Sequence, residues 1–139
     1  MSCAIDTNAL VDLVTGEEVF ALSIASALEQ EGAKGALVIA PPVYAECLAH
    51  PRWNPRALDR FLAETRLTVD WALERAIWVR AGEAFSAYAR HREKSGGGAP
   101  RRILADFIIG AHAESIGALL TRDLGFYKTY YPKLRLVSA

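Results

Sequence analysis

In the stretch GALLTRDLGFY, residues 117–127, a short apolar run ends abruptly in a threonine, an arginine and Asp123. The run, Ala118–Leu120, has the length and composition of a buried strand. CAIDTNAL, residues 3–10, repeats the pattern near the start of the chain, where an apolar run leads directly into Asp6. In an open parallel sheet the functional crevice lies outside the carboxyl ends of the strands. We therefore expect both aspartates at the same edge of one sheet.

The sequence between these two stretches alternates short strand patterns with longer helical patterns, which is typical of a parallel α/β sheet. Strands are predicted at residues 2–5, 36–40, 67–69, 118–120 and, at an edge, 134–137. Helices are predicted at 43–49, at 55–65 behind an Asn54 cap, at 72–94 and at 101–115, with a helical turn at 126–131. A further helix after the first strand is expected to use Phe20, Leu22, Ile24, Ala25 and Leu28 as its apolar face and to end before Gly32. The glycine-rich segment 95–100 is predicted to be a mobile loop.

Composition predicts one globular domain over residues 1–139, since 52% of the residues are hydrophobic and the chain can bury a core. No export signal and no run of about 18 apolar residues is visible, so we expect a cytoplasmic protein with no membrane association. Cys3 and Cys47 match no metal-ligand spacing and are expected to be buried thiols, and three scattered histidines give no zinc signature. Sixteen basic side chains balance sixteen acidic ones, so a polyanion would have to be held by a local basic patch.

Two more acids stand alone in apolar surroundings. Glu46 is the only charged residue between Lys34 and His50, and Asp106 is the only ionisable group in the apolar helical segment ILADFIIGA. A helix that is apolar nearly all round is mostly buried. A buried carboxylate must be neutralised, paired or bound to a metal.

Each acid also has an ordinary structural explanation. Asp6 could cap the turn after its strand, and Asp123 could cap the segment that follows it. Glu46 could be a solvated helix residue, and Asp106 could pair with one of the arginines at 101–102. If all four acids converge, a proton or a cation must relieve their repulsion. Oxygen ligands without a Cys/His cluster favour a hard ion, Mg²⁺ or Mn²⁺, over zinc.

Four segments in this order resemble the signature segments of the PIN domain over essentially the whole chain: AIDTNAL at 4–10, the isolated Glu46, LADFIIGAHA at 104–113 and LLTRDLGFY at 119–127. The small size and the C-terminal segment are most similar to VapC-type toxins of toxin–antitoxin pairs. The resemblance implies a three-layer α/β/α fold with a central, mainly parallel sheet of four to five strands. It also implies an Mg²⁺- or Mn²⁺-dependent endoribonuclease that forms a homodimer, binds an antitoxin protein and cleaves RNA.

The acids that match the family pattern are Asp6, Glu46, Asp106 and Asp123. Phosphodiester hydrolysis needs an activated water and charge relief, which divalent ions supply, so we assign these acids to metal binding and catalysis. Asp6 and Asp106 are expected to be ligands. Asp123 is expected to bind the ion directly or through water, and Glu46 to bind it or to orient the attacking water.

Other residues near these acids are predicted to support them. Thr121 could bond an aspartate or a metal-bound water, or be an ordinary strand threonine, and Asn8 could set the loop after Asp6 or simply form a turn. Arg101, Arg102 and Arg122 are the candidate contacts to RNA phosphates. His112 lies off the face of Asp106, which favours a surface or supporting position over that of a general base.

Two other kinds of function are compatible with parts of this pattern. An aspartyl-phosphate phosphohydrolase of the haloacid dehalogenase type also places an aspartate after its first strand, but it needs a second acid two residues later, where this chain has Asn8. A non-catalytic PIN-like module for RNA binding or protein interaction would be marked by the loss of acids, and none is lost. Metal-dependent cleavage of RNA would distinguish the enzyme from both alternatives.

Overall fold

The computed structural model describes residues 1–16, 18–96 and 101–138. Within these residues five parallel strands form one sheet in the order β3-β2-β1-β4-β5, which confirms the predicted α/β fold with its parallel sheet. The strands are β1 (Cys3–Ile5), β2 (Leu37–Ile39), β3 (Leu67–Val69), β4 (Ala118–Leu120) and β5 (Arg135–Val137). The helices are α1 (Thr7–Thr15), α2 (Glu18–Lys34), α3 (Pro41–Leu48), α4 (Pro55–Glu64), α5 (Arg75–Lys94), α6 (Leu104–Ile116) and α7 (Leu124–Tyr130).

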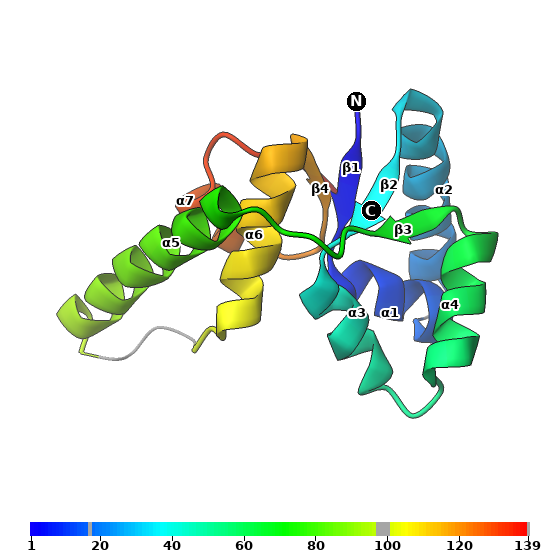
Figure 1. The fold of residues 1–139 in the computed structure, drawn as a ribbon, viewed down its shortest axis with the longest axis horizontal. Coiled ribbons are helices and arrows are strands. Elements are labelled where there is room, and N and C mark those ends of the chain that lie inside the picture. The colour runs from blue at the N-terminus through cyan, green and yellow to red at the C-terminus, as the bar shows by residue number, and fades with distance from the viewer. Residues whose placement is uncertain (17, 97–100, 139) are drawn as a thin grey trace.

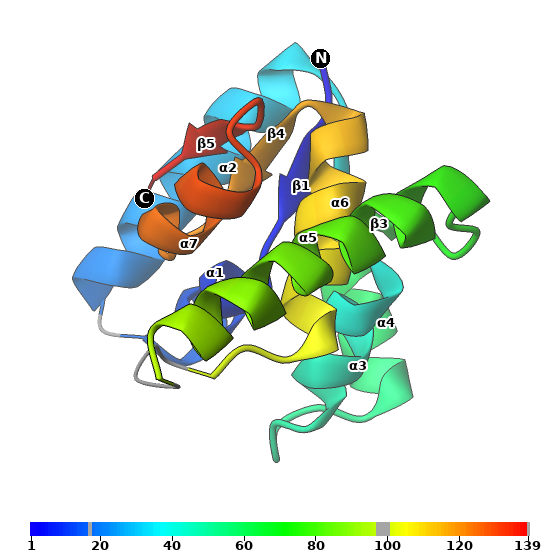
Figure 2. The same ribbon diagram turned by 90° about the vertical axis from the view of Figure 1, so that its left-hand side faces the viewer.

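Helices cover both faces of the sheet, giving three layers. Figure 1 shows α5 and α6 on one side of the strands and α2 and α4 on the other. Helix α6 packs directly on β1 and β4, and α5 packs on the outer side of α6, which it crosses in Figure 2. No helix in the described residues is long and apolar enough to cross a membrane.

Strand β1 lies at the centre of the sheet and next to β4, although the two are far apart in sequence. Ala4 pairs with Leu119 and Ile5 with Leu120. The amide of Asp6 then donates to the carbonyl oxygen of Leu120 at 2.9 Å. Because both strands are parallel and in this register, Asp6 and the residues after β4 leave the sheet side by side at its carboxyl edge.

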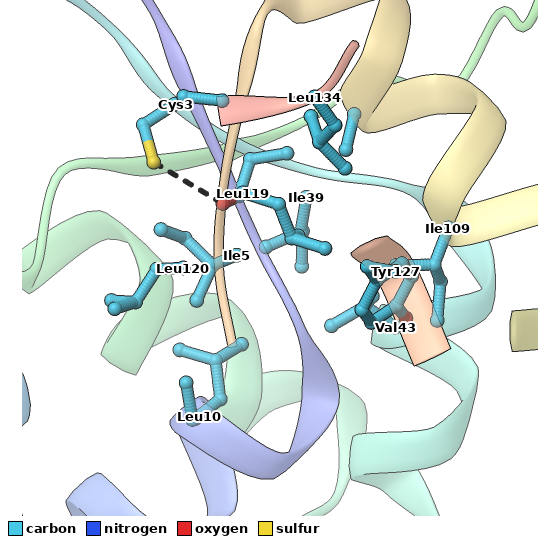
Figure 3. Close-up of a cluster of buried hydrophobic side chains, with 14 of the residues drawn as sticks. Cys3, Ile5, Leu10, Ile39, Val43, Ile109, Leu119, Leu120, Tyr127 and Leu134 are labelled. Atoms are coloured by element: carbon cyan, nitrogen blue, oxygen red, sulfur yellow. Dashed lines mark hydrogen bonds between the residues drawn. The ribbon is translucent and has the colours of Figure 1, made fainter. Parts of the chain in front are cut away.

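The core is built from the apolar strands and the helix faces that cover them, as Figure 3 shows for the side chains around β1 and β4. Ile5, Leu119 and Leu120 are at most 1% exposed. Strands buried on both faces read as continuous apolar runs rather than alternating ones, which is why short runs were sufficient to predict them. Cys3 and Cys47 are buried free thiols, as predicted.

Several helix boundaries follow their sequence signals and others do not. The Asn54 side chain accepts from the amide of Ala57 and caps α4 as predicted. Helix α2 continues through Gly32 to Lys34, so the predicted end before this glycine is wrong. Phe20 and Leu22, assigned to its apolar face, are 47% and 64% exposed. Ala25 is also exposed, because the buried face of α2, centred on Ile24, is narrower than the predicted apolar face.

The remaining differences concern where helices begin. Helix α1 was not predicted, and α5 begins at Arg75 rather than at residue 72. Helix α6 is buried from Phe107 to Ala113 as its apolar sequence predicts, but Ile103 and Leu104 before this stretch are 58% and 47% exposed. The predicted loop at 95–100 lies mostly outside the described residues.

Candidate functional site

Five carboxylates line one pocket of about 390 Å³ at the carboxyl edge of the sheet. Four belong to the acids singled out from the sequence, and the fifth is Asp12, on α1. They come from the end of β1, from α1, α3 and α6, and from the segment after β4. A larger, mainly apolar groove of about 660 Å³ lies along α2 and shares none of these acids. Of these two pockets, the smaller one is therefore where the acidic side chains gather.

Asp6 lies deepest in this pocket and is 6% exposed. One carboxylate oxygen accepts from the Thr7 amide at 2.7 Å, so Asp6 does cap the following helix. The other accepts from the Thr121 hydroxyl at 2.8 Å and from the Tyr127 hydroxyl at 3.2 Å. Burial nevertheless raises the pKa of Asp6 to about 6, against these hydrogen bonds and with a smaller contribution from the negative charge of Asp106. The site holds this carboxylate with more donors than a helix cap requires.

Thr121 connects the two aspartates that follow β1 and β4. It is fully buried, and its hydroxyl donates to Asp6 while accepting from the amide of Asp123 at 3.0 Å. Asn8 also connects the residues that follow the two strands. Its side-chain amide lies 3.4 Å from Asp6 Oδ2, and its Oδ1 accepts from the amide of Arg122 at 3.3 Å. These contacts fix the turns after both strands relative to each other.

Glu46 projects from α3 and is half-buried. Its Oε1 accepts from the Thr7 hydroxyl at 2.6 Å, which ties α3 to the start of α1. Glu46 is therefore not a freely solvated helix residue, the ordinary explanation considered for it above.

Asp106 lies in the first turn of α6, where the helix macrodipole favours a negative charge. It accepts from the amide of Ile103 at 3.3 Å. Burial is the main cause that raises the pKa of Asp106, and the negative charge of Asp123 adds to it, while the Ile103 amide and the Arg102 charge oppose it. In the described part of the chain Asp106 forms no ion pair with an arginine, because Arg102 pairs with Asp123 instead.

The three candidate arginines occupy different places. The Arg102 guanidinium forms an ion pair with Asp123 and lies 4.4 Å above the ring of Phe126. Arg122 Nε lies 2.6 Å from Asp12 Oδ2 at the rim of the same pocket. Arg101 does not line the acidic pocket and belongs to a neighbouring one. Two of the three cations therefore neutralise acids of the pocket.

The donor set fits a hard cation in its chemistry, because every candidate ligand is a carboxylate oxygen. Among the described residues, however, no three acidic, histidine or cysteine side chains lie close enough together to hold an ion as they stand. The raised pKa values of Asp6 and Asp106 mean that ionising either carboxyl group costs more free energy in the folded protein than in water. Ion binding would draw these carboxylates together and would compete with Arg102 for Asp123.

Sequence reasoning missed three polar side chains that contact the acids or line their pocket. Thr7 and Tyr127 donate to Glu46 and Asp6, and Asp12 pairs with Arg122. Only Asp12 left a usable signal, since it is a single acid on the apolar segment after β1. A threonine and a tyrosine in those positions look the same whether or not they contact a carboxylate.

His112 is placed differently from its predicted surface or supporting position. It is fully buried, and its Nε2 lies 3.2 Å from Asp70 Oδ2, just after β3. Burial lowers the pKa of His112, with the Asp70 carboxylate opposing that shift. It does not line the acidic pocket. His112 is therefore a packed core residue.

Comparisons with known proteins agree with this architecture. A family model described as PIN domain matches residues 3–131. Among solved structures, VapBC-1 from nontypeable Haemophilus influenzae superposes with a TM-score of 0.68 at 18% identity, covering 99% of this chain and 98% of that chain. VapBC2 from Rickettsia felis, bound to a DNA fragment from its promoter, gives 0.65 at 18% identity with the same coverage. DNA-bound VapBC from Salmonella typhimurium gives 0.63 at 14% identity, again with the same coverage. No curated protein sequence matches the chain significantly.

Proposed function

The chain belongs to the PIN domain family, and from this membership we propose that it is an Mg²⁺- or Mn²⁺-dependent endoribonuclease and the toxin of a toxin–antitoxin pair. The observation that carries the proposal is the convergence of Asp6, Glu46, Asp106 and Asp123 on one pocket. These acids come from four separate segments of the chain. Ordinary structural needs do not bring four carboxylates together, because their mutual repulsion opposes folding.

Asp6, Asp106 and Asp123 would hold the ion, which relieves charge on the phosphate and makes a bound water more acidic. Glu46 would bind the ion as well, or would accept a hydrogen bond from the attacking water and orient it. Thr121 and Asn8 keep Asp6 aimed into the pocket through the hydrogen bonds described above.

Arg102 and Arg122 supply positive charge at the rim of this otherwise acidic pocket. Each now contacts a carboxylate, so each can exchange that carboxylate for a phosphate oxygen when RNA approaches. Arg102 is the better placed of the two, since its partner Asp123 is one of the proposed ligands. Binding of the ion to Asp123 would free the Arg102 guanidinium for the substrate.

The three solved neighbours described above are named as VapBC proteins, two of them bound to DNA. We extend this likeness to our chain as a proposal: a cognate antitoxin protein, a homodimer, a single catalytic domain over residues 1–139, and action on RNA in the cytoplasm. Expression with and without the product of the adjacent reading frame tests the partner. Growth arrest only in the absence of that product is the expected result.

Purified protein incubated with single-stranded RNA tests the enzyme directly. We expect cleavage with Mn²⁺ or Mg²⁺ and none with EDTA, and loss of cleavage in Asp123→Asn. Asp59→Asn removes a carboxylate from α4, outside the pocket, and should cleave like the wild type. Equal cleavage by Asp123→Asn and the wild type would refute the site. RNA binding without cleavage would instead favour the non-catalytic module, and a phosphoryl group trapped on Asp6 would favour the phosphohydrolase.

A further inference from the structure

A second pocket of about 300 Å³ lies beside the acidic one, and Arg102 lines both. Its other lining residues are Phe85, Tyr88, Ala89 and Arg92 of α5, together with Arg101. Among the residues that the structure describes, no acid lines it, in contrast to the five in the neighbouring pocket. Three arginines and two aromatic rings thus face one small space.

The aromatic wall of this pocket is anchored in the core. The ring of Phe85 stacks on that of Phe107, with 4.9 Å between centroids and 14° between planes. The ring of Tyr88 also packs on Phe107, and its hydroxyl accepts from the amide of Arg102 at 2.7 Å. This last bond ties the pocket to the residue that leads into the acidic site. The wall is therefore held in place before any ligand arrives.

Planar rings beside guanidinium groups are the combination that binds single-stranded nucleic acid. A base stacks on an aromatic or guanidinium face while arginines contact its phosphate. Only an unpaired base can enter such a pocket, because duplex RNA keeps its bases stacked. A volume of about 300 Å³ is at the lower end for ligand pockets and suits one nucleotide rather than several.

We propose that this pocket, which we call the basic–aromatic pocket, binds the nucleotide adjacent to the cleaved phosphodiester of a single-stranded RNA. The proposal rests on the ribonuclease function above and adds a subsite for one base of the substrate. Phe85 and Arg92 form the stacking surface, and Arg101 holds a phosphate. An RNA strand that leaves the acidic pocket past Arg102 enters this pocket next.

Binding of fluorescent RNA of about twelve nucleotides, followed by anisotropy in EDTA, tests the subsite without cleavage. A series of RNAs carries one abasic position each. For the wild type we expect one abasic position to weaken binding about tenfold, since stacking of a single base contributes at that level. The double variant Arg92→Gln/Arg101→Gln should bind intact RNA about tenfold more weakly and lose its sensitivity to that position.

A matched control is the double variant Arg75→Gln/Arg90→Gln, which removes two exposed arginines of α5 that do not line the pocket. It should retain the abasic sensitivity, and melting curves of both variants should show that they are folded. Equal weakening in the two double variants, or a wild type that is indifferent to every abasic position, would overturn the subsite. The test of the wild type against the abasic series requires neither double variant, so it stands even if a variant fails to fold.

The outcomes separate the subsite from the enzyme. Abasic sensitivity without metal-dependent cleavage would remove the ribonuclease function and leave a binding site for unpaired bases. Cleavage by a protein that ignores every abasic position would keep the enzyme and remove the subsite. Absence of RNA binding under all conditions would refute both.

Discussion

Replacing Asp6 with asparagine tests the electrostatics of the acidic pocket most directly. The Asp6 carboxylate is 6% exposed, and its burial raises its pKa from 3.8 to about 6. Asparagine has nearly the same shape but does not ionise. The variant therefore lacks the cost of holding a charge in this place, although it loses some of the hydrogen bonds that Thr121 and Tyr127 donate to the carboxylate.

The sign of the effect follows from the two pKa values. Because the folded-state pKa of Asp6 lies above the unfolded value, the folded protein binds more protons between about pH 4 and 6. The contribution of Asp6 to the free energy of unfolding is therefore lost as the pH rises through this interval. Each pH unit is worth about 1.4 kcal/mol, which gives about 3 kcal/mol in all.

Urea unfolding in EDTA at a series of pH values measures this contribution. The free energy of unfolding of Asp6→Asn, minus that of the wild type, should rise by about 2.4 kcal/mol between about pH 4 and pH 7, since part of the total change falls below pH 4. The lost hydrogen bonds change this difference by the same amount at every pH, so they do not affect its dependence on pH. Asp59→Asn is the control for removing one negative charge. A difference that stays constant or falls with pH would show that burial does not govern the ionisation of Asp6.

The remaining predictions concern the ion, the bond between the strand ends, and packing. Asp106→Asn should gain much less melting temperature than the wild type during a Mn²⁺ titration. An ion that binds only the folded state stabilises it by about 2.7 kcal/mol at a hundredfold excess over Kd. Equal gains in the two proteins would exclude Asp106 as a ligand. Thr121→Val should lower the free energy of unfolding by about 1–3 kcal/mol by removing a buried donor, whereas Thr129→Val on the exposed side of α7 should change it little in the same urea titration. Gly110→Ala should destabilise the fold by about 1–3 kcal/mol, because the added Cβ would lie 2.2 Å from the Tyr131 ring. Gly82→Ala, with open space around the added Cβ, should stabilise α5 by about 0.5–1 kcal/mol. Melting curves that rank the two variants in the opposite order would contradict this packing.

The common edge of the two strand ends could be predicted from sequence, because the carboxyl ends of parallel strands joined by helical crossovers all lie at one edge of the sheet. The sequence did not indicate that β1 and β4, which lead to Asp6 and Asp123, are neighbours in the sheet. Helix α1 was harder to foresee. Thr7–Thr15 is short and contains β-branched residues, and its start depends on the bond from the Thr7 amide to Asp6.

The partners of the acids could not be read from the sequence for a different reason. Arg102 can reach Asp106 or Asp123, and the choice depends on the ring of Phe126, on which its guanidinium lies. The position of Tyr127 against Asp6 likewise depends on how α7 returns over the sheet. Local patterns specify which segments form helices and strands, whereas long side chains choose partners only after the segments have packed.

The central position of β1 has a consequence for how the molecule is made. Its neighbour β4 is followed by Thr121, Asp123 and, on α7, Tyr127. A nascent chain that has reached residue 116 therefore already contains Asp6, Glu46 and Asp106 but lacks the two hydroxyl groups that donate to Asp6. Contacts of such long sequence separation are slow to form, because the entropy of closing a long loop must be overcome first. The ribosome would thus carry an incomplete pocket until the segment from β4 to Tyr127 has been synthesised, has emerged and has packed against β1.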